Sequence, residues 1–250
     1  MKICRFERSG KVGIGILEGD EIWVCDENLN KTEELWYRDE VKLVAPANPS
    51  KIVCVGRNYA EHAAELGNEV PKAPLLFLKA PSSIIGPDEP IFIPPQADQV
   101  EHEGELAVII GRRAKDIGDD EDPLKYVLGC TCLNDVTARD IQRADVQFTR
   151  GKSFDTFCPI GPVIETELDV SDVRVTCSVN GEVKQDGRTT QMVFPVPFLI
   201  RYISQQMTLM PGDVIATGTP SGVSKLSDGD VCEVTIDGIG TLRNTVSLAA

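Results

Sequence analysis

Short apolar runs, each stopped by a glycine, a proline or a polar turn, constrain the fold of this chain more than any other feature. They are too short for core helices and rich in valine and isoleucine, as buried strands are. The clearest are Lys51–Val55, Leu106–Ile110, Val127–Leu133, Val214–Thr217 and Val231–Ile236. Only one longer helix is expected, over Pro195–Met207. The pattern predicts a mainly β fold with a few short helices (α+β) rather than a doubly wound α/β fold.

The sequence pattern also predicts how the chain is divided. Residues 1–48 carry short alternating runs that close with the polar segment Pro46–Ser50, which predicts a small N-terminal β-rich domain. Residues 49–250 would then form the main domain. Within it, Asn180-Gly181 separates two strand-like runs. Both residues tolerate positive φ, so a type I′ hairpin is expected there.

Composition excludes several classes of partner. The chain has 39 acidic and 25 basic residues, a formal net charge of −14, which argues against a nucleic-acid partner. The N-terminus MKICRFERSG has no apolar signal segment, and no apolar run approaches the roughly 20 residues of a membrane span. We therefore expect a soluble, cytoplasmic protein with no membrane partner. The eight scattered cysteines form no CxxC pair, and we interpret most of them as small buried hydrophobes in a reducing compartment.

Three acids stand on alternate residues at the start of the segment Gln99–Gly111, which reads QVEHEGELAVIIG. On a strand, residues i and i+2 share a face, so Glu103 and Glu105 should lie side by side, with Glu101 further toward the exposed end. Two adjacent carboxylates repel each other unless a proton or a cation lies between them. Taken alone, the segment fits a metal site and a frayed strand end equally well. His102 should point to the opposite face, in a supporting role.

A third candidate carboxylate follows the buried run Val127–Leu133. Asp135, Arg139 and Gln142 have the spacing i, i+4, i+7, which predicts one helical face within a helical segment over Asn134–Val146. Asp135 could complete an oxygen-only set for a hard cation such as Mg²⁺. No cysteine or histidine cluster competes for zinc. The alternative is an exposed helical acid that pairs with Arg139.

Three further motifs could carry chemistry. His62 and Glu65 lie one turn apart in the expected helix Arg57–Leu66 and could form a general base, or a surface pair. Lys152 could lie beside an oxyanion, or be a solvated loop lysine. The segment Thr217–Gly222 follows a strand and could bind a carboxylate through N–H groups and hydroxyls, or be only a turn.

The order of these motifs along residues 50–222 strongly resembles the fumarylacetoacetate hydrolase family. The segments that carry the resemblance are GRNYAEHAAELG, VEHEGELAVIIG, LNDVTARDIQ, GKSFDTFCPIGP and ATGTPSGV. The resemblance implies a β-roll catalytic fold, a homodimer, and a divalent metal held by three carboxylates. Mg²⁺ is the expected ion, with Mn²⁺ and Ca²⁺ as alternatives. The implied partner is a small 2-oxo acid substrate.

Motif matching also carries the family's residue roles onto this chain. The implied metal ligands are Glu103, Glu105 and Asp135. The implied catalytic residues are the water-activating pair His62 and Glu65, together with Lys152, which would stabilise charge on substrate oxygens. The implied substrate-binding residues are Arg57, Tyr59, Arg139, Gln142 and Thr219.

Two departures narrow the resemblance to the short members of the family. Only about 48 residues precede the core, and Val55–Tyr59 lacks the extra metal-ligand aspartate of the larger enzymes. The expected function is hydrolysis of a C–C bond in an acylpyruvate-type substrate through an enolate that the metal stabilises. The alternatives are an isomerase/decarboxylase of the 2-hydroxyhepta-2,4-diene-1,7-dioate type and an oxaloacetate decarboxylase. A remote alternative is a non-catalytic metal-binding protein on the same scaffold.

Overall fold

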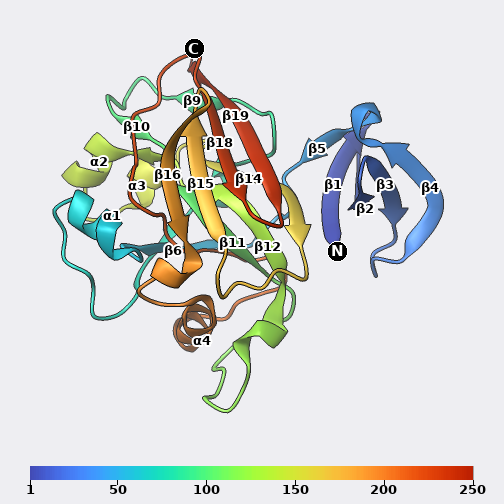
Figure 1. Cartoon of the computed structure of the whole chain (residues 1–250), viewed down its shortest axis with the longest axis horizontal. Helices are drawn as coiled ribbons and strands as arrows, with labels where there is room; N and C mark the ends of the chain where they lie inside the picture. Colours follow the sequence, from blue (N-terminus) through green and yellow to red (C-terminus); the bar gives the residue numbers. More distant parts are fainter. Residues whose placement is uncertain (250) are drawn as a thin grey trace.

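Strands dominate the computed structural model, which describes residues 1–249 (Figure 1). Nineteen strands form three sheets of twelve, five and two strands. The α-helices are α1 (Ala60–Glu65), α2 (Arg139–Ala144), α3 (Thr149–Lys152) and α4 (Val196–Gln206). The 3₁₀ turns are η1 (Arg38–Glu40), η2 (Pro81–Ser83), η3 (Pro123–Tyr126) and η4 (Thr189–Gln191). The expected mainly β fold with a few short helices is confirmed.

The twelve-stranded sheet has the order β4-β3-β2-β1-β14-β12-β11-β17-β6-β7, with β5 paired to β1 and β8 paired to β14. Its strands are β1 (Lys2–Arg8), β2 (Lys11–Glu18), β3 (Glu21–Cys25), β4 (Lys31–Tyr37), β5 (Lys42–Val44), β6 (Ile52–Gly56), β7 (Leu75–Lys79), β8 (Ile84–Ile85), β11 (Gly104–Ile110), β12 (Val127–Asn134), β14 (Cys158–Glu165) and β17 (Val214–Ala216). The first four strands, blue in Figure 1, extend this sheet at one side of the molecule because β1 pairs with β14. The division at residue 48 stays a prediction.

The five-stranded sheet has the order β16-β15-β18-β19-β9, and β10 pairs with β13 in the two-stranded sheet. These strands are β9 (Ile91–Ile93), β10 (Val100–Glu101), β13 (Thr137–Ala138), β15 (Arg174–Val179), β16 (Glu182–Arg188), β18 (Val231–Ile236) and β19 (Gly240–Leu248). Asn180 and Gly181 join β15 to β16 with φ of 53° and 79°. Positive φ at both positions confirms the expected type I′ hairpin.

Strand β11 is the centre of the molecule, and every one of its residues is buried. Leu106, Val108 and Ile110 face the hydrophobic cluster that includes the five-stranded sheet. Ala107 and Ile109 face a second cluster on the other side of the large sheet. A strand that is buried on both faces needs an unbroken apolar run rather than an alternating one. This explains the sequence LAVII, and it places the acids that precede this run at the edge of the core.

The helical segment expected over Asn134–Val146 is wrong in its first part. Asn134 ends β12, Thr137–Ala138 forms β13, and only Arg139–Ala144 is helical. The backbone N–H of Asp135 donates to the carbonyl of Glu103 at 2.8 Å, and that of Arg139 donates to the carbonyl of Gln99 at 2.7 Å. These long-range bonds replace the local bonds of a helix. The expected helix over Pro195–Met207 is confirmed as α4.

Two further expectations concern membranes and cysteines. Among residues 1–249, no helix combines the length and the apolar character needed to cross a bilayer. All eight cysteines are free thiols, and all but Cys25 are buried. The interpretation of most cysteines as small buried hydrophobes is confirmed.

A buried carboxylate joins the segment before β6 to the segment before β17. Asp213 is fully buried and accepts hydrogen bonds from the backbone N–H groups of Ser50, Lys51 and Met210, besides an ion pair with the Lys51 ammonium. Burial alone would raise the pKa of Asp213, but the bonds from Lys51, Ser50 and Met210 outweigh it and lower the pKa. The Asp213 carboxylate therefore stabilises the fold in its charged form.

Asp213→Asn should lower the free energy of unfolding at pH 7 by about 1–3 kcal/mol. A carboxyl whose folded pKa is lowered stabilises fully above its unfolded pKa of about 3.9, and this contribution is lost as the pH falls through the folded value. The difference in the free energy of unfolding between wild type and variant, measured by urea unfolding, should therefore decrease between pH 5 and pH 3 to within about 1 kcal/mol. Asp120→Asn, at an exposed position, is the control. A difference in the free energy of unfolding that stays constant with pH would contradict this account.

Candidate active site

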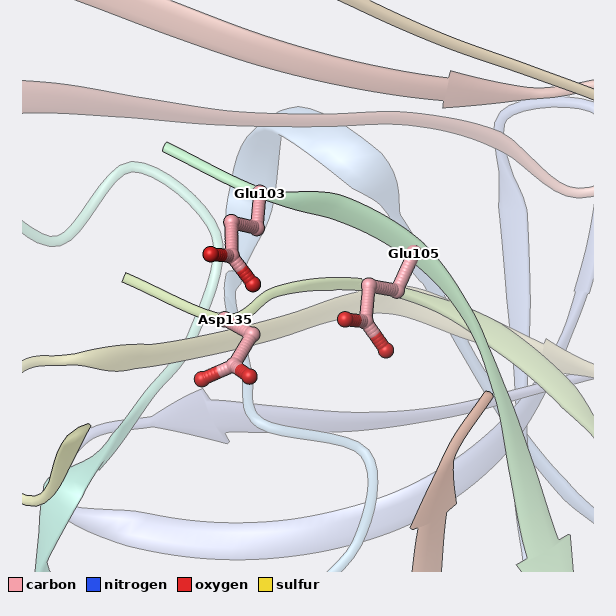
Figure 2. A group of neighbouring side chains, drawn as sticks. All are labelled: Glu103, Glu105 and Asp135. Carbon is pink, nitrogen blue, oxygen red and sulfur yellow. The ribbon is translucent and has the colours of Figure 1, made fainter. Parts of the chain in front are cut away.

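Three carboxylates converge where β11 begins and β12 ends. Glu105 lies on β11, Glu103 precedes that strand and Asp135 follows β12, and the register of Gly104 opposite Asn134 brings the strand ends together. One oxygen from each carboxylate lies within 4.8 Å of the others. Figure 2 shows the three groups pointing toward a common centre. Glu103, Glu105 and Asp135 are 4%, 2% and 1% exposed, so the alternative of a frayed strand end whose acids face solvent is wrong.

The strand expected through Glu103 is interrupted there. β10 ends at Glu101 and β11 begins at Gly104. The backbone N–H of Glu103 donates to the side-chain oxygen of Asn134 at 2.9 Å instead of to a strand neighbour. Despite this break, Glu103 and Glu105 still direct their carboxylates to the same place, as the sequence spacing predicts.

Three buried cations surround two of the carboxylates. Lys152 Nζ lies 2.8 Å from Glu103 Oε2 and 2.7 Å from Asp135 Oδ2. Arg139 Nη2 lies 2.5 Å from Glu103 Oε1, and Lys79 Nζ lies 2.6 Å from Asp135 Oδ1. Lys152 is therefore a buried part of the site, and the solvated-loop alternative is wrong.

Arg139 also binds a fourth buried carboxylate. Its Nε lies 2.7 Å from Glu101 Oε2, and its Nη1 donates to Gln142 Oε1 at 2.6 Å. The exposed position expected for Glu101 is wrong, since this residue is 6% exposed. The alternative pairing of Arg139 with Asp135 on a helix surface is also wrong, because the backbone between them is not helical.

Glu105 differs from its neighbours because no cation among residues 1–249 pairs with it. Its hydrogen bond comes from the backbone N–H of Gly218 at 2.7 Å. Burial and the charges of Asp135 and Glu103 raise the pKa of Glu105 well above its usual range. Burial would also raise the pKa of Glu103, but Lys152 and Arg139 outweigh burial and lower it. Glu105 is thus the carboxylate whose charge most needs a further cation.

The charges and donor atoms of the site fit a divalent metal. When all four buried carboxylates are ionised, as in a metal-bound site, they outnumber the three buried cations by one negative charge. The three converging groups offer only oxygen atoms, which Mg²⁺ and Mn²⁺ accept and which zinc sites seldom use alone. Glu103, Glu105 and Asp135 are the residues that could hold such an ion.

A histidine–glutamate pair lies on α1 beside these carboxylates. His62 Nδ1 lies 3.1 Å from Glu65 Oε2, and the backbone N–H of Gly222 donates to Glu65 Oε1 at 3.0 Å. His62 is 5% exposed, so the surface-pair alternative is wrong for the histidine. With Nδ1 engaged, Nε2 is the ring nitrogen available for proton transfer.

A cavity of about 330 Å³ joins these groups. Its apolar wall includes Val55, Leu66, Phe77 and Phe148. The expected site residues that line it are Arg57, His62, Glu103, Glu105, Asp135, Arg139, Gln142, Lys152 and Thr219. Glu65 is not part of this lining but contacts His62, which is. Tyr59 lines a separate cavity of about 150 Å³ beside Ser221, with its buried hydroxyl unpaired, so its role as a substrate ligand stays a prediction.

The turn before α1 places Arg57 on the cavity wall. Arg57 has φ of 58°, in the left-handed region, which costs a non-glycine residue about 1 kcal/mol. Asn58 holds this turn: its side-chain amide donates to the carbonyls of Thr217 at 2.7 Å and Phe194 at 3.1 Å. It also accepts from the backbone N–H of Phe194 at 2.9 Å. A fully buried side chain thus keeps the strained turn in place.

Sequence reasoning did not assign a site role to Lys79, Glu101, Asn58 or Gln185. Lys79 gave one usable signal, because a lysine that ends the apolar run LLFLK needs a buried partner or an exit to water. Glu101 also gave a signal, because it alternates in sequence with Glu103 and Glu105 and would share their face of a strand. No sequence signal points to Gln185, which lies 1% exposed on β16. His102, as expected, is turned away from the carboxylates and contacts Gln185 and Ser224.

Comparisons with known proteins find relatives that match almost the whole chain. The family described as "Fumarylacetoacetate (FAA) hydrolase C-terminal" matches residues 51–247, and "Rv2993c-like, N-terminal" matches residues 1–46. The chain is 42% identical to a mitochondrial oxaloacetate tautomerase of Xenopus laevis, over 97% of this chain and 78% of that protein.

Two solved structures are similar over the whole chain. A 2-hydroxyhepta-2,4-diene-1,7-dioate isomerase from Mycobacterium marinum superposes with a TM-score of 0.93 at 41% identity, covering 100% of this chain and 99% of that one. A maleylpyruvate hydrolase from a Sphingobium species, solved with Mn²⁺ and pyruvate, superposes with a TM-score of 0.83 at 30% identity, covering 100% of both chains. The expected fold is confirmed by these similarities.

Proposed function

The chain belongs to the fumarylacetoacetate hydrolase family, and from that premise we propose that it is a divalent-metal-dependent enzyme that generates an enolate from a small dicarboxylic 2-oxo acid. Family membership confirms the expectation of an enzyme. The observation that carries the finer proposal is the buried cluster of Glu103, Glu105 and Asp135 beside the pair His62–Glu65, within one cavity.

The charge of the site favours an anionic 2-oxo acid. A divalent ion held by Glu103, Glu105 and Asp135 would change the net charge of the buried groups from −1 to +1, which attracts one carboxylate. Mg²⁺ is the expected ion, and Mn²⁺ is supported by the relative solved with that metal. When bound, such an ion polarises a carbonyl oxygen and stabilises the negative charge that develops on it.

Lys152 is suited to bind a substrate oxygen as a cation. Burial would lower the pKa of Lys152, but Asp135 and Glu103 outweigh it and raise the pKa, so the ammonium stays protonated. Two of its three N–H donors are used on those carboxylates, which leaves one for a substrate. The guanidinium group of Arg139 donates to Glu101, Glu103 and Gln142. Arg139 therefore mainly holds the neighbouring groups in place.

Two arginines on the cavity wall favour a second carboxylate on the substrate. Arg57 and Arg143 both line the cavity, and in the described part of the chain neither has a carboxylate partner. Arg143 makes one long contact, 3.5 Å, to Gln99. Guanidinium groups bind carboxylates well because their donors match the two oxygens. We infer that the distal carboxylate of a dicarboxylic substrate lies between them.

Arg143→Met should raise KM for oxaloacetate about 10-fold, since a hydrogen bond to a charged group is lost. KM for acetylpyruvate, which lacks a distal carboxylate, should change by less than about threefold. Steady-state kinetics on both substrates measures the difference. Arg113→Met, at an exposed position outside the cavity lining, is the control. Equal effects on the two substrates would argue against a dicarboxylate subsite at Arg143.

Hydrolysis of a C–C bond is the outcome that the pair His62–Glu65 favours. Glu65 is fixed at one oxygen by Gly222 and at the other by His62 Nδ1. His62 lines the cavity, and this pairing leaves its Nε2 unused. A histidine held in this way can take a proton from water, which then attacks the distal carbonyl carbon. Lys152 would donate to the oxygen that becomes negative.

Tautomerisation or isomerisation is the second candidate. It is favoured by the names of relatives, an oxaloacetate tautomerase and a diene-dioate isomerase. In this reaction the same histidine would move a proton between carbon and oxygen, and no water would add. Decarboxylation of oxaloacetate would instead form the enolate of pyruvate by loss of CO₂. The expected homodimer and the cytoplasmic location stay predictions.

A metal-supplemented screen tests the proposal directly. Oxaloacetate, acetylpyruvate, fumarylpyruvate and a 2-hydroxyhepta-2,4-diene-1,7-dioate should be incubated with the protein after chelation and after addition of Mg²⁺ or Mn²⁺. We expect turnover of at least one dicarboxylic substrate only with metal. Full activity in the chelated protein would contradict metal dependence. Tight metal binding without turnover of any substrate would favour the non-catalytic alternative.

A further inference from the structure

Gly104 separates Glu103 from Glu105, and side chains hold both its backbone N–H and its carbonyl. Its N–H donates to Gln185 Oε1 at 2.9 Å, and its carbonyl accepts from Thr219 Oγ1 at 2.8 Å. A Cβ at position 104 would lie 3.0 Å from Cys177 Cβ and 3.5 Å from Gln185 Oε1. The glycine therefore permits the five-stranded sheet to approach the metal-ligand segment this closely.

Gln185 reaches this segment from β16, on the other sheet. Its Oε1 also accepts from His102 Nδ1 at 3.1 Å, and its Nε2 donates to Thr219 Oγ1 and to the carbonyl of Pro220, both at 2.7 Å. Both lone pairs of Gln185 Oε1 and both N–H groups of its Nε2 are thus engaged in hydrogen bonds, so the side-chain amide has one defined orientation. With Thr219 and Gly104 it closes a ring of three hydrogen bonds, because Thr219 accepts from Gln185 and donates to Gly104.

We propose that Gln185 is a positioning residue that sets the separation of Glu103 and Glu105 by holding the Gly104 peptide, and that it couples this separation to the cavity through Thr219. The inference rests on the proposed metal-dependent function. Gln185 does not line the cavity, so it acts through Gly104 and Thr219. Groups that orient metal ligands without touching the metal are known to change metal affinity, because they fix ligand geometry in advance.

The test measures metal affinity without requiring turnover. Mn²⁺ binding is titrated by electron paramagnetic resonance in the full-length protein, for wild type, Gln185→Met and Gln185→Asn. Methionine keeps the length of the side chain and removes its hydrogen bonds. Asparagine keeps the amide but is one methylene shorter, so the amide lies farther from Gly104. We expect the Mn²⁺ dissociation constant to rise about 10- to 100-fold for methionine and less for asparagine. KM for the substrate that wild type turns over should rise in both variants.

Two controls separate positioning from general stability. Ser224→Ala removes the 2.8 Å contact to His102 Nε2 and leaves all contacts of Gln185 intact, so Mn²⁺ affinity should stay within about twofold. In a double-mutant cycle that combines Gln185→Met with Thr219→Val, the effects on Mn²⁺ affinity and KM should be less than additive, since both residues act on Gly104. Additive losses would overturn the coupling through Thr219.

The outcomes distinguish this inference from the proposed function. Wild-type Mn²⁺ affinity in the folded Gln185 variants, with only a lower melting temperature, would overturn the inference alone. Where the methionine variant does not fold, the asparagine variant decides by the same measure. Absence of Mn²⁺ binding by wild type would overturn the proposed function and the inference together.

Discussion

Replacement of Glu105 by glutamine should abolish divalent-metal binding and lower kcat by more than about 100-fold, while the metal-free protein becomes more stable. The loss follows because Glu105 is one of the three proposed oxygen ligands, and even groups that only orient the ligands are worth about 10- to 100-fold in metal affinity. The gain follows because Glu105 is a buried carboxylate without a cation partner among residues 1–249. Removing its charge should raise the metal-free free energy of unfolding by about 1–3 kcal/mol.

Glu103→Gln is the matched control for that prediction. It should abolish metal binding and activity to the same extent, but it should destabilise the metal-free protein by about 1–3 kcal/mol. Glu103 contributes to the pairing of Arg139 and Lys152, and its loss leaves two buried cations with weaker compensation. Urea unfolding with chelator present, together with Mn²⁺ titration, measures both effects. Stability changes of the same sign in the two variants would contradict the charge assignment.

The convergence of three carboxylates could be predicted because local spacing and chain order were both informative. Glu103 and Glu105 have strand parity, and Asp135 follows a buried strand that pairs with β11. The strand edges and the hairpin at Asn180-Gly181 follow from short-range rules in the same way. Each of these features depends on residues that are close in sequence or on neighbouring strands.

The cations and amides that contact these carboxylates and their backbone could not be predicted, since they come from distant segments. Lys79 precedes Asp135 by 56 residues, and Gln185 follows Gly104 by 81. The helix expected to begin at Asn134 failed for the same reason, because residues 135–139 form hydrogen bonds with residues 99–103. Helical spacing therefore predicted a pairing of Arg139 with Asp135, whereas the fold pairs Arg139 with Glu101 and Glu103.

Replacement of His62 by alanine should separate the reactions that the site could perform. For an acylpyruvate, kcat for hydrolysis should fall by about 10²–10⁴, because the base that activates water is lost. Decarboxylation of oxaloacetate should fall by less than about 10-fold, since it needs no activated water. Glu65→Gln, which weakens the orientation of His62 and keeps its neighbours, should reduce hydrolysis less than His62→Ala does. Glu61→Gln, at an exposed position on the same helix, is the control.

The pattern of losses across substrates assigns the role of His62. A large loss in hydrolysis alone identifies His62 as the base for water, as its position beside the cavity and its bond to Glu65 favour. An equally large loss in oxaloacetate tautomerisation would show that His62 moves a proton of the substrate, which favours the second candidate function. Comparable losses in hydrolysis and decarboxylation would contradict water activation. In that case His62 would contribute mainly to substrate binding, and KM rather than kcat should carry the effect.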